Sequence, residues 1–168
     1  RGSAELALGR TLAARNTLVS ILEVEPRRVP ESLGLLKQAF AGDAAPELQA
    51  YLEGCLQRVQ ATSLVLALAE IKRETLGDVG VAKFIADHLK QNPTIRGLTQ
   101  LIALHIDNTS GVARENLSIL RSFTEALVSD KPTYRCGECG LSGKSLHWHC
   151  PSCRHWGTTE RIYGLEGE

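Results

Sequence analysis

Four of the five cysteines lie near the C-terminus in two C-x-x-C motifs of identical spacing. A C-x-x-C turn brings two thiolate sulfurs onto one cation, and a second turn completes a tetrahedral site of four sulfurs. Coordination of this closed kind leaves no open position for water or substrate. The spacing therefore predicts a structural metal site, and its predicted ligands are Cys136, Cys139, Cys150 and Cys153.

Other uses of paired cysteines fit this pattern less well. Two disulfides would require an oxidising compartment and would make no use of the paired spacing. A thioredoxin-like redox pair opens a helix after a strand, whereas glycine and proline interrupt both turns here. A site of four sulfurs accepts zinc or iron. We expect one metal ion per chain: zinc, the ordinary structural ion, with iron, which would make a one-electron carrier, as the alternative.

The residues around the two motifs are further candidates. His147 and His149 flank Trp148, and either histidine could replace a thiolate; with four cysteines present, we expect them to hydrogen-bond around the site or to form a recognition edge. Trp148 and Trp156 are the only tryptophans, and we expect their rings to cover the site and pack it on the preceding helices, with partner binding as the alternative. Four cations could offset the charge of the thiolates, namely Arg135, Lys144, Arg154 and Arg161.

The composition excludes several classes of protein. The 168 residues are 43% hydrophobic, enough for a real core and a small appendage. Lys plus Arg and Asp plus Glu both count 19, which argues against a non-specific nucleic-acid binder. No apolar run is long enough to span a membrane and no signal-peptide pattern opens the chain, so we expect a soluble polypeptide with its reduced cysteines in the cytosol. Because the chain lacks methionine and begins Arg1-Gly2-Ser3, we expect an excised fragment, and any membrane anchor would lie outside this sequence.

Most of the chain before the cysteines carries a helical pattern. From Ala4 to about Asp130, apolar residues recur at helical spacing, and strand-like alternation is absent. Proline, glycine and asparagine divide this stretch into about seven helices of roughly 12 to 18 residues. The predicted breaks are Pro26 and Pro30, Gly42 to Pro46, Gly77 to Gly80, Asn92-Pro93, and Asn108 to Gly111.

Three of these helices can be overlaid on one another. Their apolar positions are Ala14, Leu18 and Ile21, then Leu48, Leu52 and Cys55, then Val81, Ile85 and His88. The shifts of 34 and then 33 or 34 residues match the length of a tetratricopeptide hairpin. We therefore predict a mainly α fold, with three to four tetratricopeptide-like hairpins in residues 1–130, the first incomplete, and a small rubredoxin-like or zinc-ribbon β domain in residues 131–168. Stacked hairpins present a curved surface that suits protein binding.

Catalytic groups are not evident in the sequence. Cys55 lies on an apolar helix face, where a buried and inert thiol is expected. His88 and His105 also occupy helical apolar positions, and we expect both to pack rather than to react. Glycine-rich phosphate loops and an ordered Ser, His and Asp set are absent. The sequence predicts that the protein is not an enzyme.

The region of the cysteines also resembles a known family. Tyr134-Arg135-Cys136-x-x-Cys139-Gly140 is followed by Leu146-x-Trp148-x-Cys150-Pro151-x-Cys153-x-x-Trp156, and Ile162-x-Gly164-Leu165-x-Gly167 closes the chain. These motifs resemble the C-terminal rubredoxin-like domain of the lipopolysaccharide assembly protein B family, and the preceding hairpins resemble its tetratricopeptide repeats. One departure is Arg161, where the family usually has proline.

The resemblance implies a function that the residue pattern alone does not. Members of this family are anchored in the inner membrane of Gram-negative bacteria and face the cytoplasm, and they couple the protease FtsH to the deacetylase LpxC to restrain lipopolysaccharide synthesis. The family's membrane helix and early repeats are not in this sequence, so the membrane would be reached only through a missing anchor. The alternative function is an iron-binding electron carrier or redox sensor fused to a binding solenoid. An RNA-binding zinc ribbon is disfavoured by the zero net charge.

Overall fold

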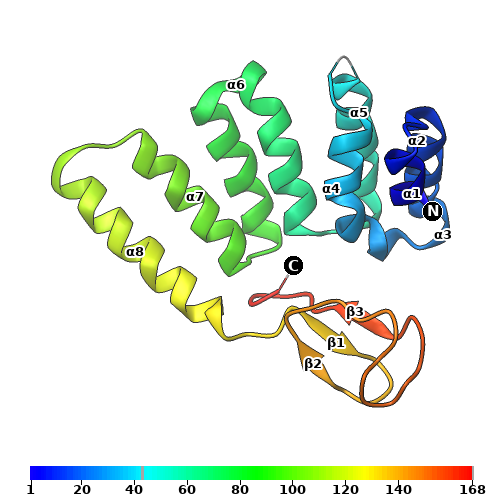
Figure 1. Cartoon of the computed structure of the whole chain (residues 1–168). Helices are drawn as coiled ribbons and strands as arrows, with labels where there is room; N and C mark the ends of the chain where they lie inside the picture. The colour runs from blue at the N-terminus through cyan, green and yellow to red at the C-terminus, as the bar shows by residue number, and fades with distance from the viewer. Residues whose placement is uncertain (43, 168) are drawn as a thin grey trace. The chain divides into compact units, whose positions relative to one another are not determined.

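The computed structural model describes residues 1–42 and 44–167. It is mainly helical and ends in a small three-stranded sheet (Figure 1), and four cysteines cluster in the region of this sheet, which confirms the predicted fold class. The chain forms two compact units, Arg1–Gly77 and Asp78–Glu168. The boundary expected between residues 130 and 131 falls inside the second unit, where the helices give way to the sheet, and it stays a prediction.

The first unit is built from short helices that pack in sequence order. The helix α1 packs against α2, α2 against α4, and α4 against α5. The leading helix α1 is only six residues long. The elements are α1 (Gly2–Ala7), α2 (Thr11–Val19), α3 (Ile21–Val24), the 3-10 helix η1 (Pro26–Arg28), α4 (Val29–Ala39), α5 (Ala45–Arg58) and the first part of α6 (Thr62–Gln91).

The overlaid positions of the predicted repeats are largely buried. Ala14 and Leu18 in the first copy are 0% and 3% exposed, and all three residues of the second copy are buried. Val81 and Ile85 of the third copy are buried too. The third position, Ile21 or His88, is only partly buried in the outer copies. The same helical face therefore supplies the core in all three helices, while the number of hairpins stays a prediction.

The helix α6 is interrupted where the two units meet in the sequence. Gly77 has φ 64° and ψ 178°, a backbone conformation that is open essentially to glycine alone. The break that the sequence predicts at Gly77 to Gly80 is confirmed at this residue.

The second unit contains a helical hairpin followed by the sheet. Its elements are the second part of α6, α7 (Ile95–Asp107), α8 (Gly111–Ser129), β1 (Tyr134–Cys136), β2 (Ser142–Gly143) and β3 (Thr159–Arg161). Thr94 caps α7, because its hydroxyl oxygen accepts a hydrogen bond from the Gly97 N–H at 3.2 Å. A Cβ at Gly97 would lie 2.5 Å from Leu89 Cδ2, so the absent side chain lets α7 pack close to the end of α6.

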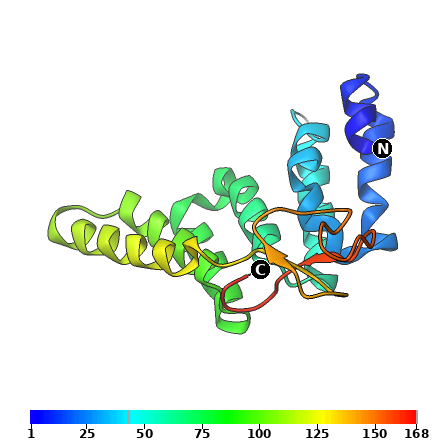
Figure 2. The same cartoon turned by 60° about the horizontal axis from the view of Figure 1, so that its bottom comes forward.

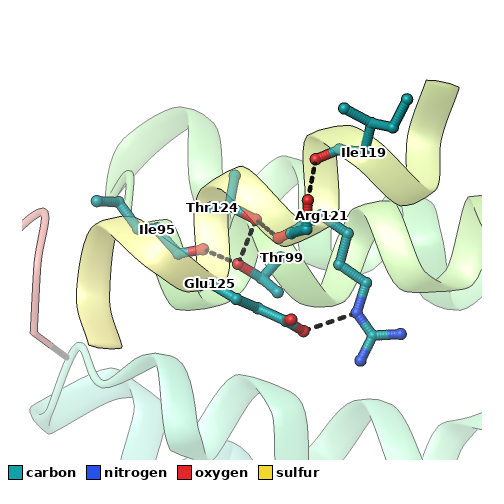
Figure 3. Close-up of polar contacts among 7 residues, drawn as sticks. Ile95, Thr99, Ile119, Arg121, Thr124 and Glu125 are labelled. Atoms are coloured by element: carbon teal, nitrogen blue, oxygen red, sulfur yellow. Dashed lines mark hydrogen bonds and ion pairs between the residues drawn. The ribbon is translucent and has the colours of Figure 1, made fainter. Parts of the chain in front are cut away.

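The hairpin of α7 and α8 is joined by a polar contact in its middle. The hydroxyls of Thr99 and Thr124 lie 2.9 Å apart, and each is also 2.8 Å from a carbonyl of its own helix, that of Ile95 or Arg121 (Figure 3). The single hydroxyl proton of Thr99 is shared between the Ile95 carbonyl and the Thr124 oxygen, so this polar pair links the two helices.

Three residues outside the cysteine motifs can now be placed. Cys55 is fully buried, as predicted, and burial raises the pKa of its thiol, which disfavours the reactive thiolate. His88 is half-buried, and burial lowers its pKa, which suits a neutral packing histidine. The prediction for His105 was wrong, because this residue is exposed: it lies two helical turns after Leu98, which is itself 43% exposed.

Candidate metal centre

The sheet of the second unit delivers the first cysteine to the site. The strand order is β2-β1-β3, with both neighbours antiparallel to the central β1. Cys136 is the last residue of β1 and lies opposite Thr159 of β3. The sheet is only two or three residues long on each strand, too small to be stable by itself. A further constraint is therefore needed to hold this region together.

Both C-x-x-C motifs form the same type of turn. In the first, Cys136 N–H donates to the Leu141 carbonyl at 2.8 Å and Gly140 N–H donates to the Cys136 carbonyl at 2.9 Å. In the second, Cys150 N–H donates to the His155 carbonyl at 3.0 Å and Arg154 N–H to the Cys150 carbonyl at 2.9 Å. The two turns thus repeat one hydrogen-bond pattern and present their cysteines in the same way.

The residue after each turn adopts a left-handed backbone. Gly140 has φ 75°, which costs glycine little, and Arg154 has φ 62° in the equivalent place. Among the described residues, Arg154 is the one non-glycine with positive φ. This unfavourable conformation is retained because the turn that presents Cys150 and Cys153 requires it.

The four sulfurs are close enough to share one ion. All four Sγ atoms lie within 4.8 Å of one another, and the pairs Cys136–Cys153 and Cys139–Cys150 are each 3.7 Å apart. A tetrahedral ion with metal–sulfur distances of about 2.3 Å would separate its sulfurs by about 3.8 Å. The spacing of the sulfurs fits such an ion. The described residues thus form a four-cysteine metal-binding site of the rubredoxin type.

Hydrogen bonds and repulsion act on the thiols in opposite directions. The Thr158 hydroxyl, with backbone N–H groups of the turn, lowers the pKa of Cys136 to about 6, and the Leu141 N–H is the main cause of the lowered pKa of Cys139. The His155 N–H favours the thiolate of Cys153, but burial and the three neighbouring sulfurs outweigh it and raise its pKa to about 12. Four thiols this close cannot all ionise to thiolates unless a cation offsets the negative charge.

The site has a covered side and an open side. Cys136 and Cys150 are 1% and 0% exposed, whereas Cys139 is exposed and Cys153 is half-buried. The prediction that Trp148 and Trp156 cover the site was wrong, since they are 55% and 74% exposed. Trp156 pairs with His149, the residue after Trp148, in an isolated two-residue bridge, and so small a ladder has no interior in which to bury such rings.

Several histidines and cations around the site contact other groups instead of coordinating the metal. His149 lies against the Trp156 ring, with ring centroids 4.7 Å apart, and the group of described residues able to hold a metal contains neither His147 nor His149. Arg161 lies over the Tyr134 ring at 5.4 Å, and Lys144 is 3.9 Å from Asp130. Arg135 lies beside the first turn, near Gly140.

The chain end after β3 returns to the start of α7. The Ile162 N–H donates to the Thr133 carbonyl at 2.9 Å, and the Ile95 N–H, at the first residue of α7, donates to the Leu165 carbonyl at 2.8 Å. Figure 2 shows the end of the chain running back from the sheet toward this helix. The first N–H groups of a helix lack partners within it, so the tail satisfies one of them. Lys131 and Glu166 form a further ion pair at 2.9 Å.

The closing glycines have a physical reason. Gly164 has φ 120°, a conformation that disfavours other residues, and a Cβ at Gly167 would overlap the Ile162 carbonyl. From the sequence, these glycines were recognised only as part of a family motif, and their role in the turn that carries the Leu165 carbonyl to α7 was missed. Their spacing was the available signal, but the helix that they reach lies some seventy residues earlier in the chain.

Comparisons with known proteins agree with this site. A family described as a rubredoxin metal binding domain matches residues 134–160. Lipopolysaccharide assembly protein B of Escherichia coli strain K12 is 31% identical over 169 residues, which cover 99% of this chain and 43% of that protein. The chain belongs to the lipopolysaccharide assembly protein B family. The family member of Haemophilus influenzae is 26% identical over 94% of this chain and 40% of its own length.

The chain thus spans less than half the length of these family members. Among the described helices, none is both long enough and apolar enough to cross a membrane. The similarity to the two proteins extends over the helices as well as the metal-binding region.

Replacing one buried cysteine should unfold the metal-binding region while the helices stay folded. We expect Cys136→Ser to lose the metal and unfold residues 131–167, because metal binding supplies the folding energy of a segment this small. The helices should keep their far-UV circular dichroism. Metal analysis and tryptophan fluorescence measure the loss, since both tryptophans lie in this segment. Cys55→Ala, at a buried cysteine outside the site, is the control and should keep the metal; equal loss in both variants would contradict the assignment.

A side chain at Gly167 should release the tail from α7. In Gly167→Ala the new Cβ would overlap a backbone carbonyl that has little freedom to move, so the turn must open. Hydrogen exchange should show faster exchange at the start of α7, including the Ile95 amide, with the metal still bound. Gly137→Ala is a matched control, because its Cβ would meet the Thr158 carbonyl at an ordinary 3.7 Å. Unchanged exchange in Gly167→Ala would show that the tail does not protect α7.

Proposed function

We propose that the chain is a non-enzymatic scaffold in lipopolysaccharide assembly, braced by one zinc ion. The proposal rests chiefly on the closed cluster of four sulfurs in a chain of this family, because such a cluster has a place for a structural ion and none for a substrate. The ligands are Cys136, Cys139, Cys150 and Cys153. When bound, the ion would supply a cross-link between the two turns and neutralise half of the charge of the four thiolates.

Two features support a scaffold rather than an enzyme. Among the described residues, the cysteine cluster is the one grouping of metal-binding side chains, and it is coordinatively closed. The perturbed groups elsewhere have structural explanations: Cys55 is buried, and Asp87 has a lowered pKa because it pairs with Lys90 at 2.6 Å. Helical hairpins in series instead supply surface for binding other proteins.

We further propose that the scaffold connects a protease to a biosynthetic enzyme. Family resemblance supports FtsH and LpxC as the partners and the cytoplasmic face of the inner membrane as the location of the whole protein. The tail supports a contribution of the metal to partner binding, because it joins the metal-binding region to α7 through Leu165 and Ile95, and a bound ion would keep that region folded. The folded metal-binding region would then hold the hairpin of α7 and α8 in a conformation suited to partner binding.

Binding measurements with purified partners test the adaptor role. We expect the immobilised chain to bind LpxC or the soluble part of FtsH, and we expect addition of the full-length protein to alter the rate at which FtsH degrades LpxC. Comparing wild type with Cys136→Ser shows whether the metal-binding region is needed. Turnover of a substrate by the chain alone would contradict the proposal, as would failure of both the chain and the full-length protein to bind either partner.

An iron-binding electron carrier is the second candidate. The observation in its favour is that Cys139 is exposed while hydrogen bonds support the thiolate of Cys136, an arrangement that also suits a rubredoxin-type iron. Protein produced with both metals available decides the matter by metal analysis and visible absorption. We expect colourless protein with one zinc per chain. A red chromophore that is reversibly bleached by reductant would support the carrier and overturn the zinc assignment.

A further inference from the structure

One face of α8 is apolar and open to solvent. Five large side chains make up this face, which we call the α8 stripe, and they are between 50% and 71% exposed: Val112, Ile119, Leu120, Phe123 and Leu127. None of the 19 residues of α8, all of which the structure describes, is buried. Apolar patches of this kind on a folded protein mark interaction surfaces.

The α8 stripe is not the face that packs within the hairpin. The half-buried residues of α8 are Leu117, Thr124 and Val128, which share a different face by their spacing of seven and four. Thr124 makes the contact with Thr99 of α7 (Figure 3). Because α8 already has its partner on that side, the α8 stripe is a second surface that the hairpin leaves unused.

The spacing along the α8 stripe is symmetric about its central aromatic residue. Ile119 precedes Phe123 by four residues and Leu127 follows it by four. Two copies of such a helix, placed antiparallel about a two-fold axis at Phe123, would bring Ile119 of one opposite Leu127 of the other. The same register sets Asn116 opposite Asp130, and both are exposed and able to hydrogen-bond. A self-complementary surface is what a two-fold interface requires.

The charges of α8 also suit association with a second copy. Arg121 and Glu125 pair with each other at 2.8 Å and lie on the face of the helix opposite Phe123, outside the α8 stripe. Pairing of two α8 stripes would therefore bury no charge from these residues. The chain has a net charge of zero, so two copies approach each other without long-range repulsion.

We propose that the α8 stripe is a self-association surface, at which two copies of this chain pair antiparallel about Phe123. In this register the two helices overlap over residues 117–129, which contain four of the five side chains. These four present apolar area on the order of 400 Å² per copy, so pairing would bury about 800 Å² in total, below the size of a standard interface. The dimer is accordingly weak and reversible. The proposal stands independently of the metal and of the adaptor role.

Sedimentation velocity over a range of concentrations tests the surface. We expect a monomer–dimer equilibrium in the micromolar range, and Phe123→Glu should weaken it at least ten-fold, because it places two carboxylates together on the axis. Val24→Glu is the matched control at a side chain that is 82% exposed outside the α8 stripe, and it should associate like wild type. Unchanged circular dichroism and metal content show that each variant folds. A wild-type monomer at all concentrations would overturn the proposal.

Cysteine cross-linking tests the register. The variants Ile119→Cys and Leu127→Cys should form a disulfide-linked dimer when mixed under mild oxidation, and each alone should cross-link poorly. Wild type under the same conditions shows whether the native cysteines contribute. Cross-linking of Ile119→Cys with itself but not with Leu127→Cys would indicate a parallel pair and overturn the antiparallel arrangement. Dimers that persist in Phe123→Glu would place the interface elsewhere.

Discussion

The convergence of four thiols on one point is the constraint on which the C-terminal region depends. Strands of two or three residues supply almost no core, so the short sheet cannot hold two turns together by burial alone. The sulfurs are nevertheless within 4.8 Å of one another. Such proximity is unfavourable for thiolates, as the raised pKa of Cys153 shows, and it becomes favourable when a cation offsets their charge. Folding of this region and metal binding therefore depend on each other.

The chain end connects the cysteine cluster to the helix α7. Cys136 ends β1, and β3 lies beside β1 and continues into the tail. The tail bends at Gly164 and offers the Leu165 carbonyl to the first N–H of α7. Order at the sulfurs, order in the sheet and the capping of α7 are consequently linked by covalent continuity and a few hydrogen bonds. The closing motif of the chain thus contains the residue whose carbonyl accepts from the start of α7.

The helices divide their surfaces between packing and exposure. In the first unit, residues such as Leu52 and Cys55 are fully buried and form the core. In α8 the division differs, because one face contacts α7 and another, centred on Phe123, remains exposed. A helix that packs on one face and exposes a second apolar face is suited to binding. This property fits the scaffold role that we propose for the chain.

The sequence by itself determined the cysteine cluster, the helical class and several helix breaks, but the predicted breaks did not include those after α1 and α2 or the one between α5 and α6. Cysteine spacing is a local property, and so are the breaks at Gly77 and Asn92-Pro93, because glycine permits backbone conformations that end a helix and proline cannot continue one. The repeat of about 34 residues likewise follows from apolar spacing, which the burial of Leu18, Leu52 and Ile85 reflects.

Only the tertiary structure decided which side chains are covered. Trp148 and Trp156 were predicted to be buried and are exposed, and His105 was predicted to pack and lies on an open face. Burial depends on what another segment places over a residue, and the neighbouring sequence does not contain that information. The same reason hid the contact between Leu165 and Ile95: it joins residues seventy positions apart, and backbone groups carry no signal in the sequence of side chains.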